Sequence, residues 1–309
     1  MKKKFADYLQ QMRQANGLTQ QQVIDHLIMA DPAFDKLDIT TFSRWERGAT
    51  APKLSKQLLL ARIFGDDIRG LIDPSIDQQE ATLEVMNDLI GPAMYPYWQG
   101  EKQSITEELL LSEANVYSLT KLKAFHEHYL GLEIAEDLIR NENVILRTIN
   151  DTQGHLLGHR LYTFVPVETP DEALDITDLR FCPFTTLEKS NKTPLSMYTI
   201  SGYNPLPDAR LANLLNLIEV LRTHPEIKYL ITNCHRQANY QLYDMNTDCE
   251  VIAKGDVTKE GGVKVFGKRY KYIRLKIKVE TLLAAKVITR ILPHSQNMHE
   301  LTKRSDESL

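Results

Sequence analysis

Helix start and stop signals follow one another so closely between residues 5 and 65 that this stretch can form only short helices. Phe5, Leu9 and Met12 recur at helical spacing, and the pattern stops at Asn16-Gly17. Capping residues, apolar runs and a following glycine or proline return three more times. The sequence therefore predicts an all-α domain with helices over residues 5–15, 20–30, 39–47 and 52–65.

Three segments of this stretch resemble the Cro/lambda-repressor-like (XRE) family: residues 17–20, residues 41–48, and Pro52 with the apolar run to residue 65. The resemblance implies a helix-turn-helix domain that binds double-stranded operator DNA. We expect a homodimer, because one such domain makes few contacts with DNA. The resemblance also implies a pairing of Arg13 with Glu46. The link before the third helix is longer than the family's tight turn.

A helix of this size fits the major groove, where its first turns reach base edges. Arg44 can bond guanine with two hydrogen bonds, and Gln20 and Lys53 are placed for phosphates. A solvated helix face is the alternative for Arg44 and Arg47. The predicted DNA-binding residues are Gln20, Ile39, Thr40, Thr41, Ser43, Arg44, Arg47 and Lys53.

The net charge of −4 is unevenly distributed along the chain. Residues 1–62 hold ten Lys/Arg and six Asp/Glu, whereas the remainder holds 27 and 35. A mildly basic N-terminal segment followed by an acidic remainder fits a protein that contacts a polyanion with one end. Random variation in charge between domains would give the same balance. The three cysteines form no CxxC pair, and no stretch approaches the roughly 18 apolar residues of a membrane span. We therefore expect a cytoplasmic protein without a metal site or membrane contact.

The pattern changes beyond residue 104, where amphipathic helices, a hairpin and alternating strands and helices follow, ending with a strand over residues 270–279 and a last helix over 281–292. This order of elements resembles the GNAT acetyltransferase fold, with residues 233–244 as the best local match. The expected fold class is thus an all-α helix-turn-helix domain followed by an α/β (α+β, GNAT-like mixed sheet) domain. The expected division is a DNA-binding domain over 1–73, a linker over 74–104, a ligand-sensing or dimerisation domain over 105–292, and a mobile tail over 293–309.

The segment that corresponds to the family's acyl-CoA loop spans residues 202–210. In the family, backbone N–H groups of a glycine-rich loop bind the pyrophosphate of acetyl-CoA. Here Pro205 and Pro207 lack N–H donors, Asp208 adds negative charge, and Arg210 is the one compensating cation. The sequence therefore favours no cofactor and no enzyme activity, while retention of acyl-CoA binding stays open.

The main hypothesis from the sequence is an XRE-type transcription regulator whose GNAT-like domain senses a small-molecule effector or dimerises. One alternative is an acetyltransferase with an attached DNA-binding domain, and another is a phage or antitoxin-type interaction protein. The predicted effector cleft lies between the fourth and fifth strands, unless core packing closes it. Its predicted ligand-binding residues are Met197, Tyr198, Tyr203, Asn233, Tyr240 and Tyr243.

Other candidate residues favour structural roles. His126 and His128 fit a solvated helix face better than a metal site, and His159 fits a strand face better than a ligand. Tyr243 would be the general acid of an acetyltransferase, but a packed tyrosine is the stronger interpretation. The seven Lys/Arg between residues 264 and 278 indicate a solvated sheet face, with an anion or DNA surface as the alternative.

Overall fold

The computed structural model describes residues 2–72, 80, 104–190, 193–245 and 247–295. The expected linker over 74–104 lies outside these residues except for Glu80 and Ser104, as does the expected tail beyond Ser295. No helix in the described ranges is long and apolar enough to cross a bilayer.

The N-terminal segment consists of short helices, as the sequence predicts. They are α1 (Lys2–Ala15), α2 (Gln20–Ala30), η1 (Pro32–Phe34), α3 (Ile39–Glu46), α4 (Leu54–Ile63) and η2 (Ile68–Leu71). Thr19 and Gln22 form a reciprocal capping box at the start of α2, and Asp38 accepts the Thr41 N–H at the start of α3. Gly17 and Gly48 follow helix ends with φ of +63° and +70°, a conformation that suits glycine.

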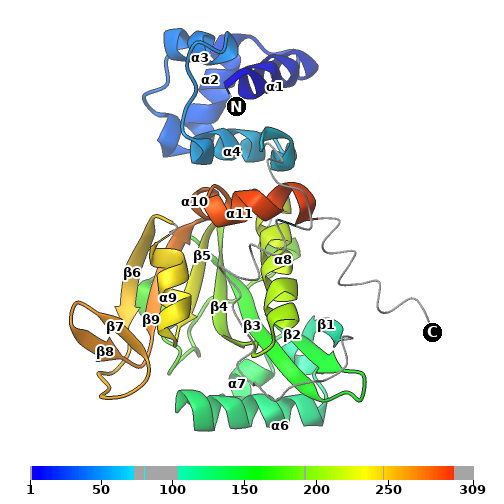
Figure 1. Cartoon of the computed structure of the whole chain (residues 1–309), viewed down its shortest axis with the longest axis vertical. Helices are drawn as coiled ribbons and strands as arrows, with labels where there is room; N and C mark the ends of the chain where they lie inside the picture. The colour runs from blue at the N-terminus through cyan, green and yellow to red at the C-terminus, as the bar shows by residue number, and fades with distance from the viewer. Residues whose placement is uncertain (1, 73–79, 81–103, 191–192, 246, 296–309) are drawn as a thin grey trace.

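Helix α4 is buried on more than one side. Leu58, Leu59, Leu60 and Ala61 are consecutive and all buried, so no face of this turn is left to solvent. A helix that is apolar all round needs cover on both sides. The rest of the helical segment covers one side, and α10 (Val279–Leu283) packs against the other (Figure 1).

The body of the protein is a mixed sheet of seven strands in the order β1-β2-β3-β4-β5-β9-β6. Only β4 and β5 pair in parallel; the other neighbours are antiparallel. A separate two-stranded sheet joins β7 (Val263–Val265) to β8 (Lys268–Tyr270). The seven strands are β1 (Ser104–Leu110), β2 (Val144–Asp151), β3 (Leu156–Pro166), β4 (Leu195–Tyr203), β5 (Ile227–Cys234), β6 (Cys249–Lys254) and β9 (Ile273–Lys278).

Helices cover both faces of this sheet. Helices α8 (Pro207–Thr223) and α9 (Gln237–Asp244) pack on the face that contains Met197 and Leu230 (Figure 1). The face that contains Tyr198 and Ile231 packs against α6 (Val116–Phe125) and α7 (Glu136–Ile139). This element order and the mixed sheet are consistent with the GNAT-like arrangement expected from the sequence.

Three details differ from the sequence-based expectations. Strand β1 was not predicted. The strand expected over residues 270–279 is shorter, because β8 ends at Tyr270 and β9 begins at Ile273. The last expected helix is divided into α10, α11 (Lys286–Ile291) and η8 (Leu292–His294).

Candidate active site

The parallel pair β4 and β5 stops pairing before either strand ends. Its last paired residues are Thr199 and Thr232, although β4 continues to Tyr203 and β5 to Cys234. At this point β4 also has a bulge: Tyr162 lies opposite Thr199 and Leu161 opposite Ser201, so Ile200 is the extra residue. A bulge bends its strand and takes backbone groups out of the ladder. The two strands therefore part at Ile200.

The side chain of Asn233 spans this parting. Its Nδ2 donates to Tyr198 Oη at 3.0 Å and to the Ile200 carbonyl at 3.1 Å. Its Oδ1 accepts from Arg274 Nε at 3.0 Å. Tyr198 in turn donates to the Leu174 carbonyl at 2.7 Å, and burial raises its pKa to about 12. Because every polar atom of Asn233 is used, this residue holds the bulge at a fixed position.

Arg274 corrects the expectation of a solvated face on the basic strand. Its side chain is only 1% exposed, and Nη1 donates to the Asp171 carbonyl at 3.0 Å. Strand alternation places Arg274 beside Tyr198 and Asn233 on the face that α6 covers. The guanidinium of Arg274 therefore lies in the protein interior and not on a solvent-exposed sheet face.

Two buried imidazoles flank a hydroxyl next to the bulge. His126 Nε2 lies 2.8 Å from Ser201 Oγ, and His159 Nε2 lies 3.5 Å from the same oxygen. Burial lowers the pKa of His126 to about 4, with a smaller contribution from His235; burial and then His126 lower that of His159 to about 3. Both rings are therefore neutral near pH 7, and each can accept a hydrogen bond from Ser201. Because burial disfavours the charged imidazolium, either ring can hold a proton from Ser201 only briefly, before the proton passes to another group.

His235, directly after β5, is a third neutral imidazole at this end of the sheet. Burial lowers its pKa to about 4, and its ring lies 5.6 Å from that of Tyr272. Its Nε2 is buried and has no hydrogen-bond partner within the described part of the chain. A buried polar atom without a partner destabilises the folded state, so His235 Nε2 is a position at which a bound molecule could form a hydrogen bond.

Two arginines approach each other from the helices that follow the parted strands. Arg210 lies in the first turn of α8, and Arg236 is the N-cap residue of α9. The pKa of Arg210 is lowered, first by partial burial and next by the Arg236 guanidinium. Like charges close together at two helix N-termini form a setting that favours anions. The sequence pointed to Arg210 alone, since only the fold brings Arg236 near it.

The predicted ligand-binding residues divide between the two faces of the sheet. Tyr198 and Asn233 are hydrogen-bonded to each other, and Tyr203 stacks near Phe125 and Tyr129 with centroids 5.5 and 5.4 Å away. Met197 is fully buried on the opposite face.

On that opposite face, Tyr240 donates to Asp244 at 3.0 Å and Tyr243 packs against the core. Their role as a set of effector-binding residues stays a prediction.

The sequence analysis missed Ser201 and assigned His126 and His159 to solvated or strand-face positions. A signal for the histidines was present. His126 lies four residues after the buried Leu122, and His159 shares a strand face with Leu161 and Val165. Nothing in the sequence pointed to Ser201, because its partners come from segments 42 and 75 residues away.

The predicted DNA-binding residues differ in their exposure, and their contact with DNA stays a prediction. Ile39, Thr40, Arg44, Arg47 and Lys53 are exposed, whereas Thr41 and Ser43 are half-buried. The pairing of Arg13 with Glu46 is present at 2.6 Å. The Gln20 amide also donates to Glu46, so this side chain is already engaged inside the domain.

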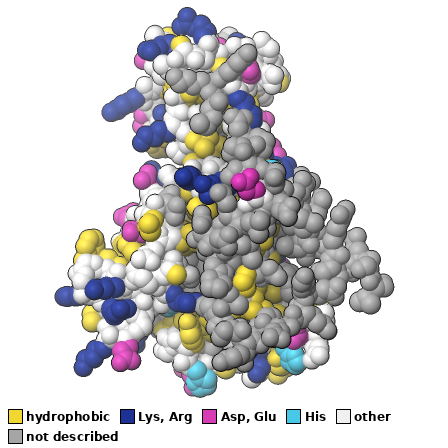
Figure 2. All heavy atoms as spheres, in the orientation of Figure 1, with side chains coloured by type: hydrophobic (Ala, Val, Ile, Leu, Met, Phe, Trp, Pro, Cys, Tyr) yellow, Lys and Arg dark blue, Asp and Glu magenta, His cyan; other side chains and the backbone are white. Residues whose placement is uncertain are grey.

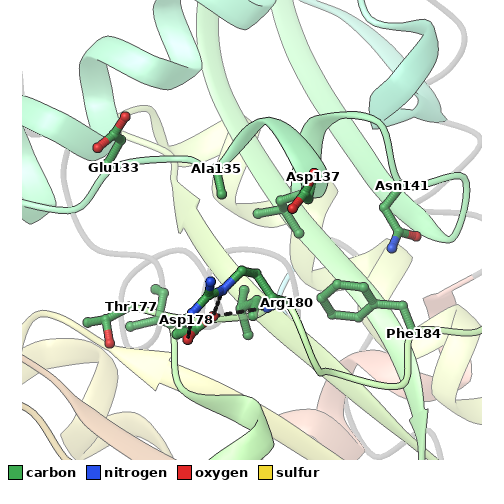
Figure 3. A pocket seen from close by; sticks show the side chains of 11 residues that line it. Glu133, Ala135, Asp137, Asn141, Thr177, Asp178, Arg180 and Phe184 are labelled. Atoms are coloured by element: carbon green, nitrogen blue, oxygen red, sulfur yellow. Dashed lines mark hydrogen bonds and ion pairs between the residues drawn. The ribbon is translucent and has the colours of Figure 1, made fainter.

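Apart from this region, a hollow with a volume of about 230 Å³ lies between α7 and the segment before β4 (Figure 3). Arg180 donates from Nε and Nη2 to the two carboxylate oxygens of Asp178, at 2.8 and 2.7 Å. Arg180 is therefore paired with Asp178, while Glu133 and Asp137 also line this hollow. Among the described residues, no group of His, Cys, Asp and Glu is arranged to hold a metal ion.

No family model and no curated protein matches the chain. Among solved structures, the chain is similar to the AHL synthase LasI at 11% identity, over 60% of this chain and 96% of that one, with a TM-score of 0.38. It is also similar to TofI in an apo form, at 12% identity over 59% and 95% of the two chains, with a TM-score of 0.35. Arabidopsis thaliana NAA60 in complex with acetyl-CoA matches at 12% identity over 56% and 98%, with a TM-score of 0.35.

These neighbours correct the main functional expectation. They include an AHL synthase, a protein in complex with acetyl-CoA and an arylalkylamine N-acetyltransferase-like protein, which stand against the expectation of an XRE-type transcription regulator and in line with the acyltransferase alternative. The expectation that the chain is not an enzyme is corrected with it, as is the description of the GNAT-like region as a sensor. Since the identities and TM-scores are low, the chemistry has to rest on this chain's own residues.

Proposed function

We propose that the GNAT-like region catalyses transfer of an acyl group from an acyl-CoA thioester to an acceptor amine. The observation that carries the proposal is the parting of β4 and β5 at the Ile200 bulge, directly beside Ser201 and its two neutral imidazoles. Backbone groups taken out of a ladder are suitable donors for a carbonyl oxygen that gains negative charge in the transition state. No other described part of the chain combines such groups with proton acceptors.

The polyphosphate of acyl-CoA is expected at the starts of α8 and α9. Pro205 and Pro207 remove two backbone donors from this loop, which makes a purely backbone cradle poor. Arg210 and Arg236 supply charge in its place. In this proposal the side chains replace part of what a glycine-rich loop provides.

Ser201 and its histidines would handle the proton. As the amine attacks, a C–N bond forms, the C–S bond breaks, and one proton leaves the nitrogen. The hydroxyl of Ser201 can donate its own proton to His126 or His159 while it accepts the proton of the amine. The departing thiolate then takes up a proton, which restores the neutral imidazole.

The test measures acyl-CoA binding and thiol release with the full chain. We expect micromolar binding of acetyl- or longer acyl-CoA, and Ser201→Ala should lower turnover by roughly 10²-fold or more. Ser196→Ala is the matched control, because Ser196 is equally buried on the same strand and its Oγ has no partner in the described residues. Millimolar or weaker binding of every acyl-CoA tried would refute the proposal.

Double-stranded DNA is the partner we propose for the helical segment, which makes the protein an acyltransferase with an attached DNA-binding domain. The supporting observation is the exposed face of α3 with Ile39, Thr40 and Arg44, opposite the buried Phe42 and Trp45. Two copies of the chain would bind a site with two halves. We place the protein in the cytoplasm, since its three cysteines are unpaired.

A further inference from the structure

The hairpin β7–β8 and the loop before it form a basic, exposed surface of the body. Residues 254–271 contain six Lys/Arg and two Asp/Glu. All six cations are exposed, and Figure 2 shows them gathered where β7 and β8 lie. We call this set the hairpin surface: Lys254, Lys259, Lys264, Lys268, Arg269 and Lys271.

The turn of the hairpin contains a residue that does not suit its conformation. Val265 pairs with Lys268, so Phe266 and Gly267 are the two turn residues, with φ of +48° and +82°. Turns of this kind favour Asn or Gly at the first position, because a bulky side chain is strained at positive φ. Phe266 is also 93% exposed, so its ring contributes no core contact in return.

The ladder of the hairpin contains a second unfavourable feature. Lys264 lies directly opposite Arg269, and like charges at opposed positions destabilise a strand pair. Asp256, an acidic residue of this segment, pairs with Lys271 at 3.1 Å, and Arg269 donates to the Gly261 carbonyl. Neither the turn nor the ladder is therefore optimised for folding alone.

The rest of the hairpin is well anchored, so these features do not reflect a loose segment. Val263 and Val265 are buried against the core, and the Lys264 N–H donates to Gln237 Oε1 of α9 at 2.7 Å. The Lys254 ammonium lies 5.8 Å from the Phe266 ring centroid and 5.5 Å from that of Tyr270. The surface thus presents an exposed ring and cations from a fixed position.

We propose that the hairpin surface binds single-stranded nucleic acid, with a base stacked on Phe266 and phosphates held by the surrounding lysines and Arg269. An exposed ring among cations is the combination that single strands use, since every base has a face to stack. A membrane would favour several exposed apolar residues at the tip, but both valines of β7 point inward and Phe266 is the exposed apolar residue of the turn; Val257, also exposed, lies in the loop before the hairpin. This binding does not depend on the acyl transfer proposed above.

The decisive variant is Phe266→Asn in the full chain. Asn is favoured at positive φ, so this change should raise the unfolding temperature while it removes the stacking ring. Fluorescence anisotropy with labelled oligo(dT) and oligo(U) should show binding weakened by at least about 5-fold. Phe181→Ala is the control, because Phe181 is 82% exposed beside Arg180 and lies outside the hairpin surface.

Salt dependence tests the charges separately. Lys264→Gln and Arg269→Gln should each flatten the slope of log K against log salt by about 0.7 if each holds one phosphate. Lys121→Gln on α6, also exposed, should leave the slope unchanged.

Three results would overturn the proposal. The first is oligonucleotide binding that Phe266→Asn leaves intact, and the second is no measurable binding. The third is Phe266-dependent binding to phosphatidylserine vesicles without binding to either oligonucleotide, which would assign the surface to membranes. Arg44→Ala should weaken duplex binding only, which separates this surface from α3.

Discussion

Arg62 of α4 forms a buried ion pair with Glu280 of α10 and donates to two backbone carbonyls of the body. The acceptors are His224 at the end of α8, at 2.8 Å, and Ile227 at the start of β5, at 2.9 Å. The Arg62 side chain is 1% exposed and that of Glu280 10%. One arginine thus connects the helical segment to three elements of the sheet region.

Removing one partner of this pair should be strongly destabilising. Glu280→Gln leaves the buried guanidinium without its counter-charge, which costs roughly 3–5 kcal/mol of unfolding free energy. Urea denaturation measures the loss. The double variant Arg62→Met with Glu280→Leu should recover much of it, since an apolar pair of similar size replaces the ions. A Glu280→Gln protein as stable as the wild type would show that the pair contributes little.

The buried histidines should make stability depend on pH. His126, His159 and His235 have pKa values of about 4, 3 and 4, against about 6.5 in an unfolded chain. Below about pH 6.5 the unfolded chain therefore binds more protons than the folded chain does. The free energy of unfolding thus has its full value above that pH and decreases as the pH falls toward 4. His126→Gln should flatten this fall in unfolding measured across pH. The exposed His128 supplies the control, because His128→Gln changes neither the buried rings nor the pair of Asp151 with His155.

Asn233 should matter for both stability and turnover. Asn233→Ala leaves Arg274 Nε and the Ile200 carbonyl without their partner, at a cost of about 1–3 kcal/mol. Because the bulge is then less well held, acyl transfer should fall as well. Thermal unfolding and thiol release test the two effects. Asn150→Ala on β2 is the control; a turnover loss of the same size there would contradict a specific role for Asn233.

The two neighbouring arginines at the starts of α8 and α9, Arg210 and Arg236, should act on acyl-CoA binding and not on the chemical step. Arg210→Ala and Arg236→Ala should each raise KM for acyl-CoA about 10-fold with kcat little changed, as expected for an interaction of equal strength in ground and transition states. Steady-state kinetics of both variants separates the two constants. A loss confined to kcat would place these residues elsewhere in the mechanism.

For α3, Arg44→Ala should weaken specific duplex binding by roughly 1–3 kcal/mol and relax base preference at one position. Mobility shift at fixed salt measures both. Operator selectivity equal to that of the wild type would remove Arg44 from the interface.

The local parts of the fold were predictable, and the distant contacts were not. The capping box at Thr19 and the N-cap at Asp38 were visible in the sequence because each depends on residues within three positions. The break in the expected strand over residues 270–279 was not visible in the sequence, because the start of β9 depends on its pairing register with β5. The candidate site fell between these cases: Asn233 was selected from local resemblance, whereas the role of Ser201 depends on His126, which directly follows α6, and on His159 of β3.

The consecutive burial of Leu58 to Ala61 sets a limit on how this chain can be divided. In a fragment that ends near residue 73, the side of α4 that packs against α10 would be exposed to water. Arg62 would also lose Glu280 and the two backbone carbonyls that it bonds. We therefore expect the helices of residues 2–72 to be less stable in such a fragment than in the full chain, because α4 uses the sheet region as part of its own packing surface.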